Sequence, residues 1–248
     1  MIRIVRDIAT AFQFLTRLPL KRLPYDTSGL SRSAKFFPLV GLAIGALGSV
    51  VYLGLVRHLP VAIAALLSLA FLVLATGGLH EDGLADVADA FGGGWNREQI
   101  LAILKDRRIG TFGALAIFLS VGLRLLLLAN LPLGRFAAYV VSSQVLCRWT
   151  ALPLGCMLPA ACESSGQGAR IARQISAGSL AIGTLITVAI VLCALRRAMW
   201  APILSTLAVT LLSGVYYWRR IGGVTGDCFG ATNQLAEIAV YLCGVWRL

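Results

Sequence analysis

The hydrophobic positions of this chain form long continuous runs. An uncharged run extends from Phe36 to Val56, and a second, Val61–Leu79, follows a short polar loop. A helix rises about 1.5 Å per residue, so a run of about twenty apolar residues crosses the hydrocarbon core of a bilayer. Further runs lie at 110–131, 136–158, 175–195, 199–218 and 229–246. The pattern predicts an all-α, polytopic membrane protein with about seven transmembrane helices.

The segment before the first run has a different pattern. Ile8, Phe12 and Leu15 recur at helical spacing among arginines in residues 1–35. Such a pattern predicts an amphipathic helix in the membrane interface, although a basic topology signal would look the same. Because a short apolar run with a small-residue cleavage site is lacking at the start, we expect no secretory leader. Without a Ser/Pro-rich linker, residues 1–248 are expected to form one integral membrane domain.

Composition and charge support this prediction and orient the chain. The chain is 58% hydrophobic and only 13% charged, and its mean hydropathy is +0.83. If the N-terminus is cytoplasmic, most loop lysines and arginines fall on its side, in 1–35, 80–109, 159–174 and 219–228. The positive-inside rule therefore predicts that the N-terminus and the 80–109 loop are cytoplasmic. The net charge of +11 then indicates attraction to anionic lipid or a phosphorylated substrate, without a nucleic-acid partner.

An acidic stripe begins where the second apolar run ends, in the segment GGLHEDGLADVADA (residues 77–90). Asp82, Asp86 and Asp89 are spaced i, i+4, i+7, so a helix places all three carboxylates on one face. Like charges this close repel unless a cation lies against them. A hard divalent ion that takes oxygen ligands, such as Mg²⁺, is the simplest candidate. The stripe therefore predicts a magnesium site for phosphate chemistry.

Cationic and titratable residues flank this stripe. Lys105, Arg107 and Arg108 follow it and are candidates to clamp a diphosphate. Asp106 between them is either a further metal ligand or a salt-bridge partner. His80 is either a base or a hydrogen-bond partner of the acidic cluster.

A second polar segment, GGVTGDCFGA (residues 222–231), lies near the C-terminus. Asp227 is at its loop-to-helix junction, and Glu237 lies further along, inside an apolar helix. An ionisable group within a span is a functional candidate by default. The alternative for Glu237 is an ion pair with an arginine of another apolar run, Arg124 or Arg148.

Taken together, the two glycine-flanked acidic segments and the intervening KDRRIGTFG (residues 105–113) closely resemble the cobalamin synthase family, and the resemblance covers essentially the whole chain. It implies a magnesium-dependent enzyme of the bacterial inner membrane. Such an enzyme joins adenosylcobinamide-GDP to α-ribazole, or to its 5′-phosphate, and releases GMP. This chain departs from the usual family pattern at Glu81, where an apolar residue is common, and at Gln234, where an acid is expected. It also departs at Arg107, where a small hydroxyl residue is common, and in the 159–174 loop.

The resemblance also implies roles for individual residues, which are carried over by motif match and charge. Metal ligands would be Asp82, Asp86 and Asp89. Catalytic residues would comprise these three with His80 and Asp227, the latter as a second-site metal ligand or a base. Substrate phosphate would be bound by a further set: Lys105, Arg108, Gly110, Thr111, Thr225 and Gly226.

Other functions and an assembly remain open at this point. The Asp-Gly segment also resembles part of the CDP-alcohol phosphotransferase signature, so another membrane phosphotransferase is one alternative. A cation or metabolite transporter is another, although its carboxylates would be expected near the bilayer midplane. Gly41 and Gly45 in the first run allow close helix packing, either within the chain or in a homo-oligomer.

Overall fold

The computed structural model describes residues 2–17, 29–106, 108–162 and 175–246. Arg107 therefore lies outside the described residues, as do parts of the 1–35 and 159–174 segments. The described chain is all-helical apart from one isolated bridge between Ala160 and Val224. This confirms the predicted all-α class.

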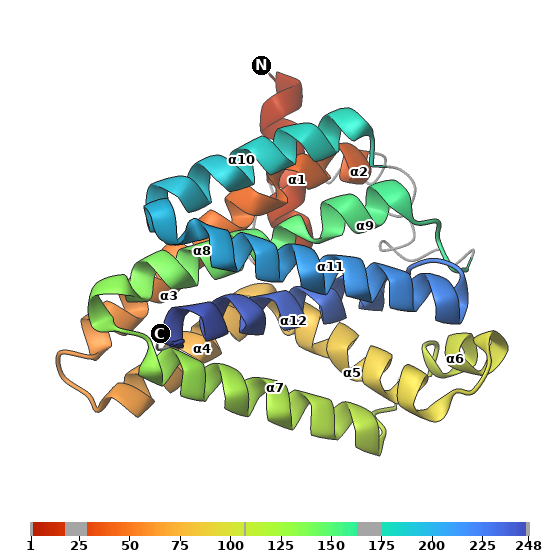
Figure 1. Ribbon diagram of the computed structural model, residues 1–248, viewed down its shortest axis with the longest axis horizontal. Helices are drawn as coiled ribbons and strands as arrows, with labels where there is room; N and C mark the ends of the chain where they lie inside the picture. The colour runs from red at the N-terminus through yellow and green to blue at the C-terminus, as the bar shows by residue number, and fades with distance from the viewer. Residues whose placement is uncertain (1, 18–28, 107, 163–174, 247–248) are drawn as a thin grey trace.

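The helices follow one another with short connections (Figure 1). The first half of the chain forms α1 (Ile2–Leu15), α2 (Leu30–Ser33), η2 (Ala34–Phe36), α3 (Phe37–Leu55), α4 (Val61–Thr76), α5 (Leu79–Gly93) and α6 (Arg97–Ile103). The second half forms α7 (Thr111–Asn130), η3 (Leu133–Arg135), α8 (Phe136–Trp149), α9 (Ala151–Met157), α10 (Ala177–Leu195), η4 (Arg196–Met199), α11 (Trp200–Ile221) and α12 (Gly226–Val245).

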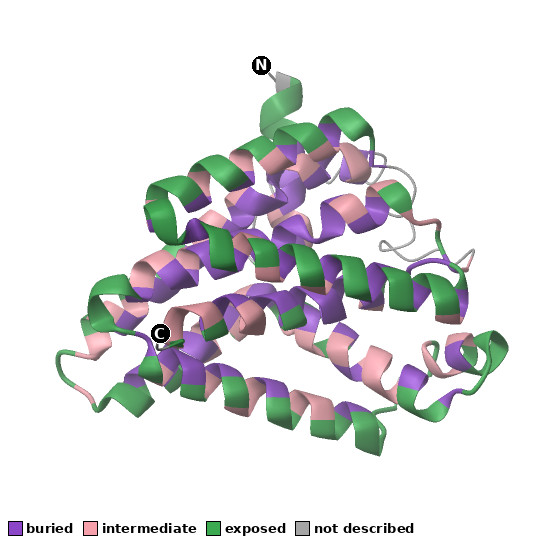
Figure 2. Ribbon diagram, viewed as in Figure 1, coloured by how far each residue is buried: buried purple, intermediate pink, exposed green. Residues whose placement is uncertain are grey.

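Helix α8 forms the centre of the bundle. Most of its residues are buried, and it packs against α3, α10, α11 and α12. Figure 2 shows buried residues concentrated on α8 and α12, whereas the outward faces of α7, α10 and α11 are exposed. These outward faces carry large apolar side chains, among them Phe118, Leu185 and Leu212. An apolar surface of this extent indicates contact with lipid.

The expected count of about seven spans is not confirmed. Three helical segments of the described chain are long and apolar enough to cross a membrane: Leu30–Leu55, Thr111–Asn130 and Ala177–Ile221, which contains α10 and α11. The pair α4 and α5 would add a fourth, but the two helices meet at 86°. We treat the apolar α4 as the membrane part of this pair and the acidic α5 as lying outside it.

Two of the expected spans, at 136–158 and 229–246, are not among these segments for physical reasons. The first is divided into α8, which has only 14 residues, and the shorter α9. The second belongs to α12, whose apolar residues alternate with Asn233, Gln234 and Glu237. Neither run therefore forms a helix of the described chain that is both long enough and apolar enough to count as a span.

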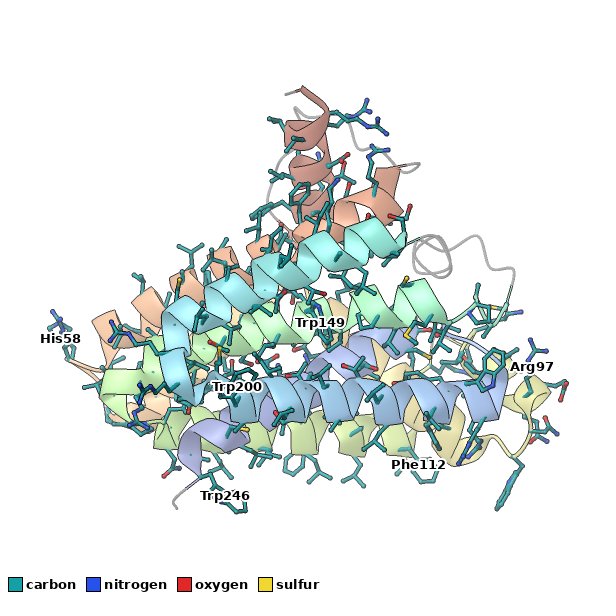
Figure 3. All side chains as sticks on the ribbon, turned by 45° about the horizontal axis from the view of Figure 1, so that its top comes forward. His58, Arg97, Phe112, Trp149, Trp200 and Trp246 are labelled. Carbon is teal, nitrogen blue, oxygen red and sulfur yellow. The ribbon has the colours of Figure 1, made fainter. Side chains whose placement is uncertain are left out.

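The connections gather at two ends of the bundle. In Figures 1 and 3 the α3–α4 loop with His58 and the C-terminal Trp246 lie at one end. Arg97 of α6 and the α11–α12 connection lie at the other end. The acidic helix α5 runs toward this second end.

The small residues of the first run serve contacts within the chain. A Cβ atom added to Gly45 would lie 2.9 Å from the Cα of Val141 on α8, and Gly41 lies against the α8 backbone at Gln144. The close helix pair predicted from Gly41 and Gly45 is therefore α3 with α8. Helix α1, the predicted amphipathic helix, buries Ala11 and Leu15 and exposes Ile4 and Val5.

Candidate active site

Two consecutive glycines turn the acidic helix away from the apolar helix before it. Gly77 and Gly78 have φ values of 68° and 73°, in the left-handed region that residues with a side chain rarely adopt. Their amides donate to the carbonyl oxygens of Leu74 (3.1 Å) and Val73 (3.0 Å), which ends α4. Helix α5 consequently starts in a new direction and carries its aspartates toward α12.

Helix α5 crosses α12 at a contact between glycines. A Cβ atom added to Gly83 would lie 2.9 Å from the carbonyl oxygen of Asp227. One added to Gly230 would lie 3.3 Å from the Cα of Gly83. This separation is too small for a side chain on either helix. The crossing brings the first acidic segment, at Asp82, next to the second, at Asp227.

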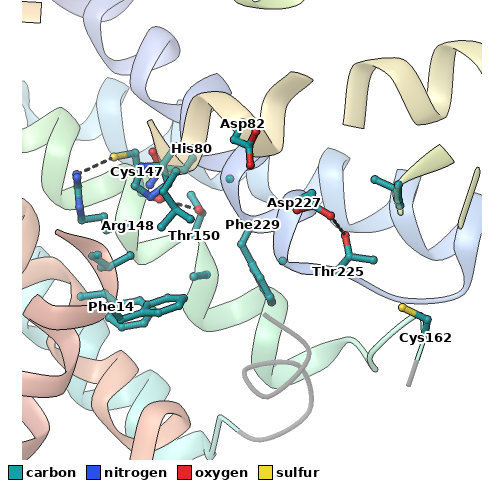
Figure 4. Close-up of a pocket in the computed structure, with 18 of the residues that line it drawn as sticks. Phe14, His80, Asp82, Cys147, Arg148, Thr150, Cys162, Thr225, Asp227 and Phe229 are labelled. Carbon is teal, nitrogen blue, oxygen red and sulfur yellow. Dashed lines mark hydrogen bonds between the residues drawn. The ribbon is translucent and has the colours of Figure 1, made fainter. Parts of the chain in front are cut away.

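A cavity of about 410 Å³ opens beside this crossing (Figure 4). Asp82, Asp227 and Thr225 lie at one side of it, and His80 and Arg148 lie at the other. Lys105 also lines the cavity. The apolar part of the wall consists mainly of aromatic and leucine side chains: Phe14, Leu15, Phe37, Leu79, Leu101, Leu104 and Phe229.

A second cavity of about 580 Å³ adjoins the first one. It is lined by Arg17 and by the glycine turn at Gly77 and Gly78, together with the polar side chains of Gln13, Thr16 and Thr76. Asp82 lines both cavities. A group that occupied either cavity would therefore approach the same carboxylate.

The carboxylates on α5 and α12 repel one another. Burial, with the negative charges of Asp227, Asp82 and Asp89, raises the pKa of Asp86 from 3.8 to about 6. Burial likewise raises the pKa of Asp227, aided by the charge of Asp82, although a hydrogen bond from Thr225 opposes the rise. The Thr225 hydroxyl donates to Asp227 Oδ2 over 3.3 Å. A cation bound between these helices would relieve the repulsion.

Asp89, the third residue of the stripe, is bonded to the start of α7. Its Oδ2 accepts a hydrogen bond from the Gly110 amide (2.7 Å), and its Oδ1 accepts one from the Gly113 amide (2.8 Å). The carboxylate thus satisfies the otherwise free amides of a helix N-terminus. Gly110, which we expected to bind phosphate, instead donates its amide to Asp89. Thr111 is exposed at the start of α7, away from both cavities.

The predicted phosphate-binding cations are separated in the structure. Lys105 lines the first cavity. Arg108 does not; it is exposed and forms a salt bridge of 2.8 Å with Asp106. Of the two alternatives for Asp106, the structure therefore shows the salt-bridge partner.

Three other predicted site residues line the first cavity: His80, Thr225 and Gly226. His80 is 7% exposed, and burial with the nearby Arg148 and Arg124 holds its pKa well below the ordinary value. Its imidazole is consequently neutral. Thr225 orients Asp227, and Gly226 is the first residue of α12.

Glu237 belongs to a buried ion-pair network next to the site. Arg124 of α7 lies 3.0 Å from Glu81 Oε1 and 3.5 Å from Glu237 Oε2. Gln234 donates to Glu81 Oε1 over 3.2 Å. Glu81 and Gln234, which both depart from the family pattern, thus contact each other and join α5 to α12.

The predicted metal site of three aspartate ligands does not form a closed cage in the structure. Among the residues that the structure describes, no group of three or more His, Cys, Asp and Glu side chains could hold a metal ion. Mg²⁺, however, usually keeps several waters and takes one or two carboxylates plus substrate phosphate. The repelling Asp82 and Asp86 fit this smaller donor set, whereas both oxygens of Asp89 already accept amide hydrogen bonds.

Sequence reasoning missed Arg148 as a residue of the site. It had appeared only as a charge within an apolar run and as a possible partner of Glu237. Its position was the available signal, because a charged residue inside an apolar helix is costly and is therefore a functional candidate. The aromatic wall of Phe14, Phe37 and Phe229 gave no signal, since its residues come from distant parts of the sequence.

Comparisons with known proteins agree over most of the chain. A family described as cobalamin-5-phosphate synthase matches residues 7–245. The adenosylcobinamide-GDP ribazoletransferase of Leptospira interrogans is 39% identical over 246 residues, which cover 94% of this chain and 92% of the relative. Proteins of the same name from Polaromonas and Clostridium botulinum are 38% and 34% identical and cover 95% and 97% of their own lengths, with 96% of this chain in each case. No solved structure matches the chain.

Proposed function

The chain belongs to the cobalamin-5-phosphate synthase family, and from that membership we propose the reaction that it catalyses. The family makes it a transferase of late cobalamin synthesis. Its substrates are adenosylcobinamide-GDP and either α-ribazole or α-ribazole 5′-phosphate. The products are adenosylcobalamin, or its 5′-phosphate, and GMP. The names of relatives that match nearly the whole chain support these substrates.

The position of Asp82 is the structural observation that carries this proposal. A transferase must bring two substrates to one reacting centre, and Asp82 lines both cavities. The first cavity offers an aromatic wall for a planar base and Lys105 for a phosphate. The second is more polar and includes Arg17. The acceptor and the donor diphosphate therefore meet at Asp82.

The reaction is a displacement at phosphorus. The 3′-hydroxyl oxygen of the ribazole attacks the cobinamide-side phosphorus of the donor. A new phosphorus–oxygen bond forms, the bond to the GMP oxygen breaks, and GMP leaves with the bond electrons. The protein mainly positions the two groups and neutralises the charge on the phosphate oxygens. Lys105 supplies positive charge on the cavity wall.

Asp227 accepts the proton of the attacking hydroxyl. Its carboxylate lines the cavity, is oriented by Thr225 and has a raised pKa, which makes it a stronger base. His80 is less suited to this role, because its protonated form would lie beside Arg148 and Arg124. His80 instead remains neutral and hydrogen-bonds substrate in the cavity.

Magnesium is part of this proposal. Asp82 and Asp86 would hold the ion together with substrate phosphate, and the ion would neutralise charge on the diphosphate. The mutual repulsion of the carboxylates supports this assignment.

A location in the bacterial inner membrane is also proposed, with the N-terminus and the cavity on the cytoplasmic side. The apolar segments and the distribution of basic residues between the two ends support it. An N-terminal cysteine tag that reacts with an impermeant thiol reagent only in inverted vesicles tests this orientation.

Product analysis with two donors tests the reaction. Membranes containing the protein receive adenosylcobinamide-GDP, α-ribazole and Mg²⁺, or a CDP-activated lipid alcohol in place of the first donor. The expected result is GMP release that depends on both substrates, with no CMP from the second donor. CMP release without GMP release would replace the proposal with a CDP-alcohol phosphotransferase. Turnover of neither donor by well-inserted protein would leave no support for a phosphotransferase.

A further inference from the structure

Arg148 is a buried cation that faces the first cavity. It lies near the end of the central helix α8, is 3% exposed and lines the cavity together with His80 (Figure 4). One terminal nitrogen donates to the backbone oxygen of Gln144 over 3.0 Å and to its side-chain Oε1 over 2.7 Å. Both partners are neutral. The Nε atom of Arg148 is buried without any hydrogen-bond partner.

Arg148 forms no ion pair with the part of the protein that the structure describes. Ion pairs among the described residues join Arg32 and Lys35 to Asp7, Arg108 to Asp106, and Arg124 to Glu81 and Glu237. No described carboxylate lies within 4.0 Å of the Arg148 guanidinium. Buried charges in proteins are normally paired, because an unpaired one loses its hydration without compensation.

Arg124, another buried arginine, differs from Arg148 because it has carboxylate partners. Arg124 is 1% exposed, similar to Arg148, yet two carboxylates flank it. The Glu237 carboxylate pairs with Arg124 rather than with Arg148. The guanidinium that lacks an ion pair is therefore the one at the wall of the first cavity.

The two sides of the first cavity carry opposite charges, which determines where an anion would bind. Asp82 and Asp227 occupy one side and repel a phosphate unless a cation intervenes. Arg148 occupies the other side, where a phosphate is attracted directly. A guanidinium with free donors matches the oxygens of a phosphate.

We propose that Arg148 binds a substrate phosphate group at the side of the first cavity opposite Asp82 and Asp227. This inference rests on the proposed function for the identity of the substrates. The phosphate has two sources, the diphosphate of the donor or the 5′-phosphate of the acceptor. Arg148 is a substrate-binding residue in either case.

Equilibrium binding to the purified full-length protein distinguishes these sources. Two compound pairs differ only by phosphate: α-ribazole 5′-phosphate with α-ribazole, and GDP with guanosine. Titration is done with EDTA present, so that a metal ion does not contribute. Wild-type protein should bind the phosphorylated member of one pair more tightly, and Arg148→Gln should reduce that preference by about ten- to a hundredfold. The affected pair identifies the source.

Two further variants separate binding from folding. Arg148→Lys keeps the charge but loses the planar fork, and should retain part of the preference. Arg135→Gln removes an exposed arginine at the other end of the bundle and should leave all four affinities unchanged. The thermal midpoint of each variant shows whether it is folded.

An unchanged phosphate preference in folded Arg148→Gln, or the absence of any preference in wild-type protein, overturns the proposal. An equal loss of affinity for phosphorylated and unphosphorylated members does so as well, because it indicates a structural role. These affinities are decisive even if GMP release is absent, an outcome that would count against the proposed function alone.

Discussion

Gly83 of α5 lies directly against the backbone of Asp227 on α12, where a Cβ atom at Gly83 would be 2.9 Å from the Asp227 carbonyl oxygen. This contact joins two acidic segments that are distant in the sequence. It also brings Asp82 and Asp227 to the wall of the same cavity. The geometry of the site therefore depends on the absence of a side chain at one helix position.

Gly83→Ala should separate α5 from α12, because the added methyl group meets rigid backbone. We expect a loss of about 1–3 kcal/mol in the free energy of unfolding and at least a tenfold loss of GMP release. Gly122→Ala is the matched control: open space surrounds Gly122 on α7, and alanine favours a helix. Thermal unfolding and activity assays measure both variants. If Gly83→Ala behaves like its control, the crossing does not set the site geometry.

Asp89 and Asp86 should respond differently to substitution. Asp89→Ala removes two hydrogen bonds from the start of α7 and should lower the free energy of unfolding by about 1–2 kcal/mol. Its apparent affinity for Mg²⁺ should stay near the wild-type value. Asp86→Asn should instead weaken Mg²⁺ binding with little loss of stability. Titration of activity with Mg²⁺ shows the difference, and a weaker apparent Mg²⁺ affinity for Asp89→Ala would return Asp89 to the metal site.

The raised pKa of Asp86 predicts that the effect of magnesium on stability depends on pH. Because the fold raises this pKa from 3.8 to about 6, it favours the protonated form. The associated stability is present at low pH and is lost as the pH rises through about 6. Magnesium should therefore raise the thermal midpoint at about pH 7.5 and have little effect at about pH 5. In Asp86→Asn the magnesium effect at high pH should shrink, and an undiminished effect would place the ion elsewhere.

Arg124→Met should be strongly destabilising. It leaves Glu81 and Glu237 buried without their cation, a change that typically costs about 3–5 kcal/mol. The exposed Arg135→Gln should stay within about 0.5 kcal/mol of wild type. Chemical unfolding in detergent compares the two. Similar stability for both would show that the network contributes nothing to joining α5, α7 and α12.

Much of the site could be predicted because its signals are local. The i, i+4, i+7 spacing placed Asp82, Asp86 and Asp89 on a single helix, which the structure confirms as α5. Asp227 was recognised at the start of a helix, and α12 begins beside it. The helical class followed from the long apolar runs.

The remaining features depend on contacts between distant segments, which local patterns do not contain. The count of about seven spans is not confirmed, because the runs at 136–158 and 229–246 correspond to helices that are mostly buried inside the bundle, a contact that a local pattern does not contain. The capping role of Asp89 requires knowledge that α7 begins beside α5. Arg148 became a candidate only when the structure showed that Glu237 pairs with Arg124.

The central claim is that the cavity beside the α5–α12 crossing, with Asp82 between the two substrate sites, is where the transfer occurs. The most direct measurement is the rate of GMP release from adenosylcobinamide-GDP and α-ribazole by membranes with equal amounts of inserted wild-type protein and Asp82→Asn. Glu98→Gln, an exposed acid on α6, is the control. We predict at least an approximately hundredfold loss for Asp82→Asn and a rate within about twofold of wild type for the control. A rate for Asp82→Asn close to that of wild type would contradict the account.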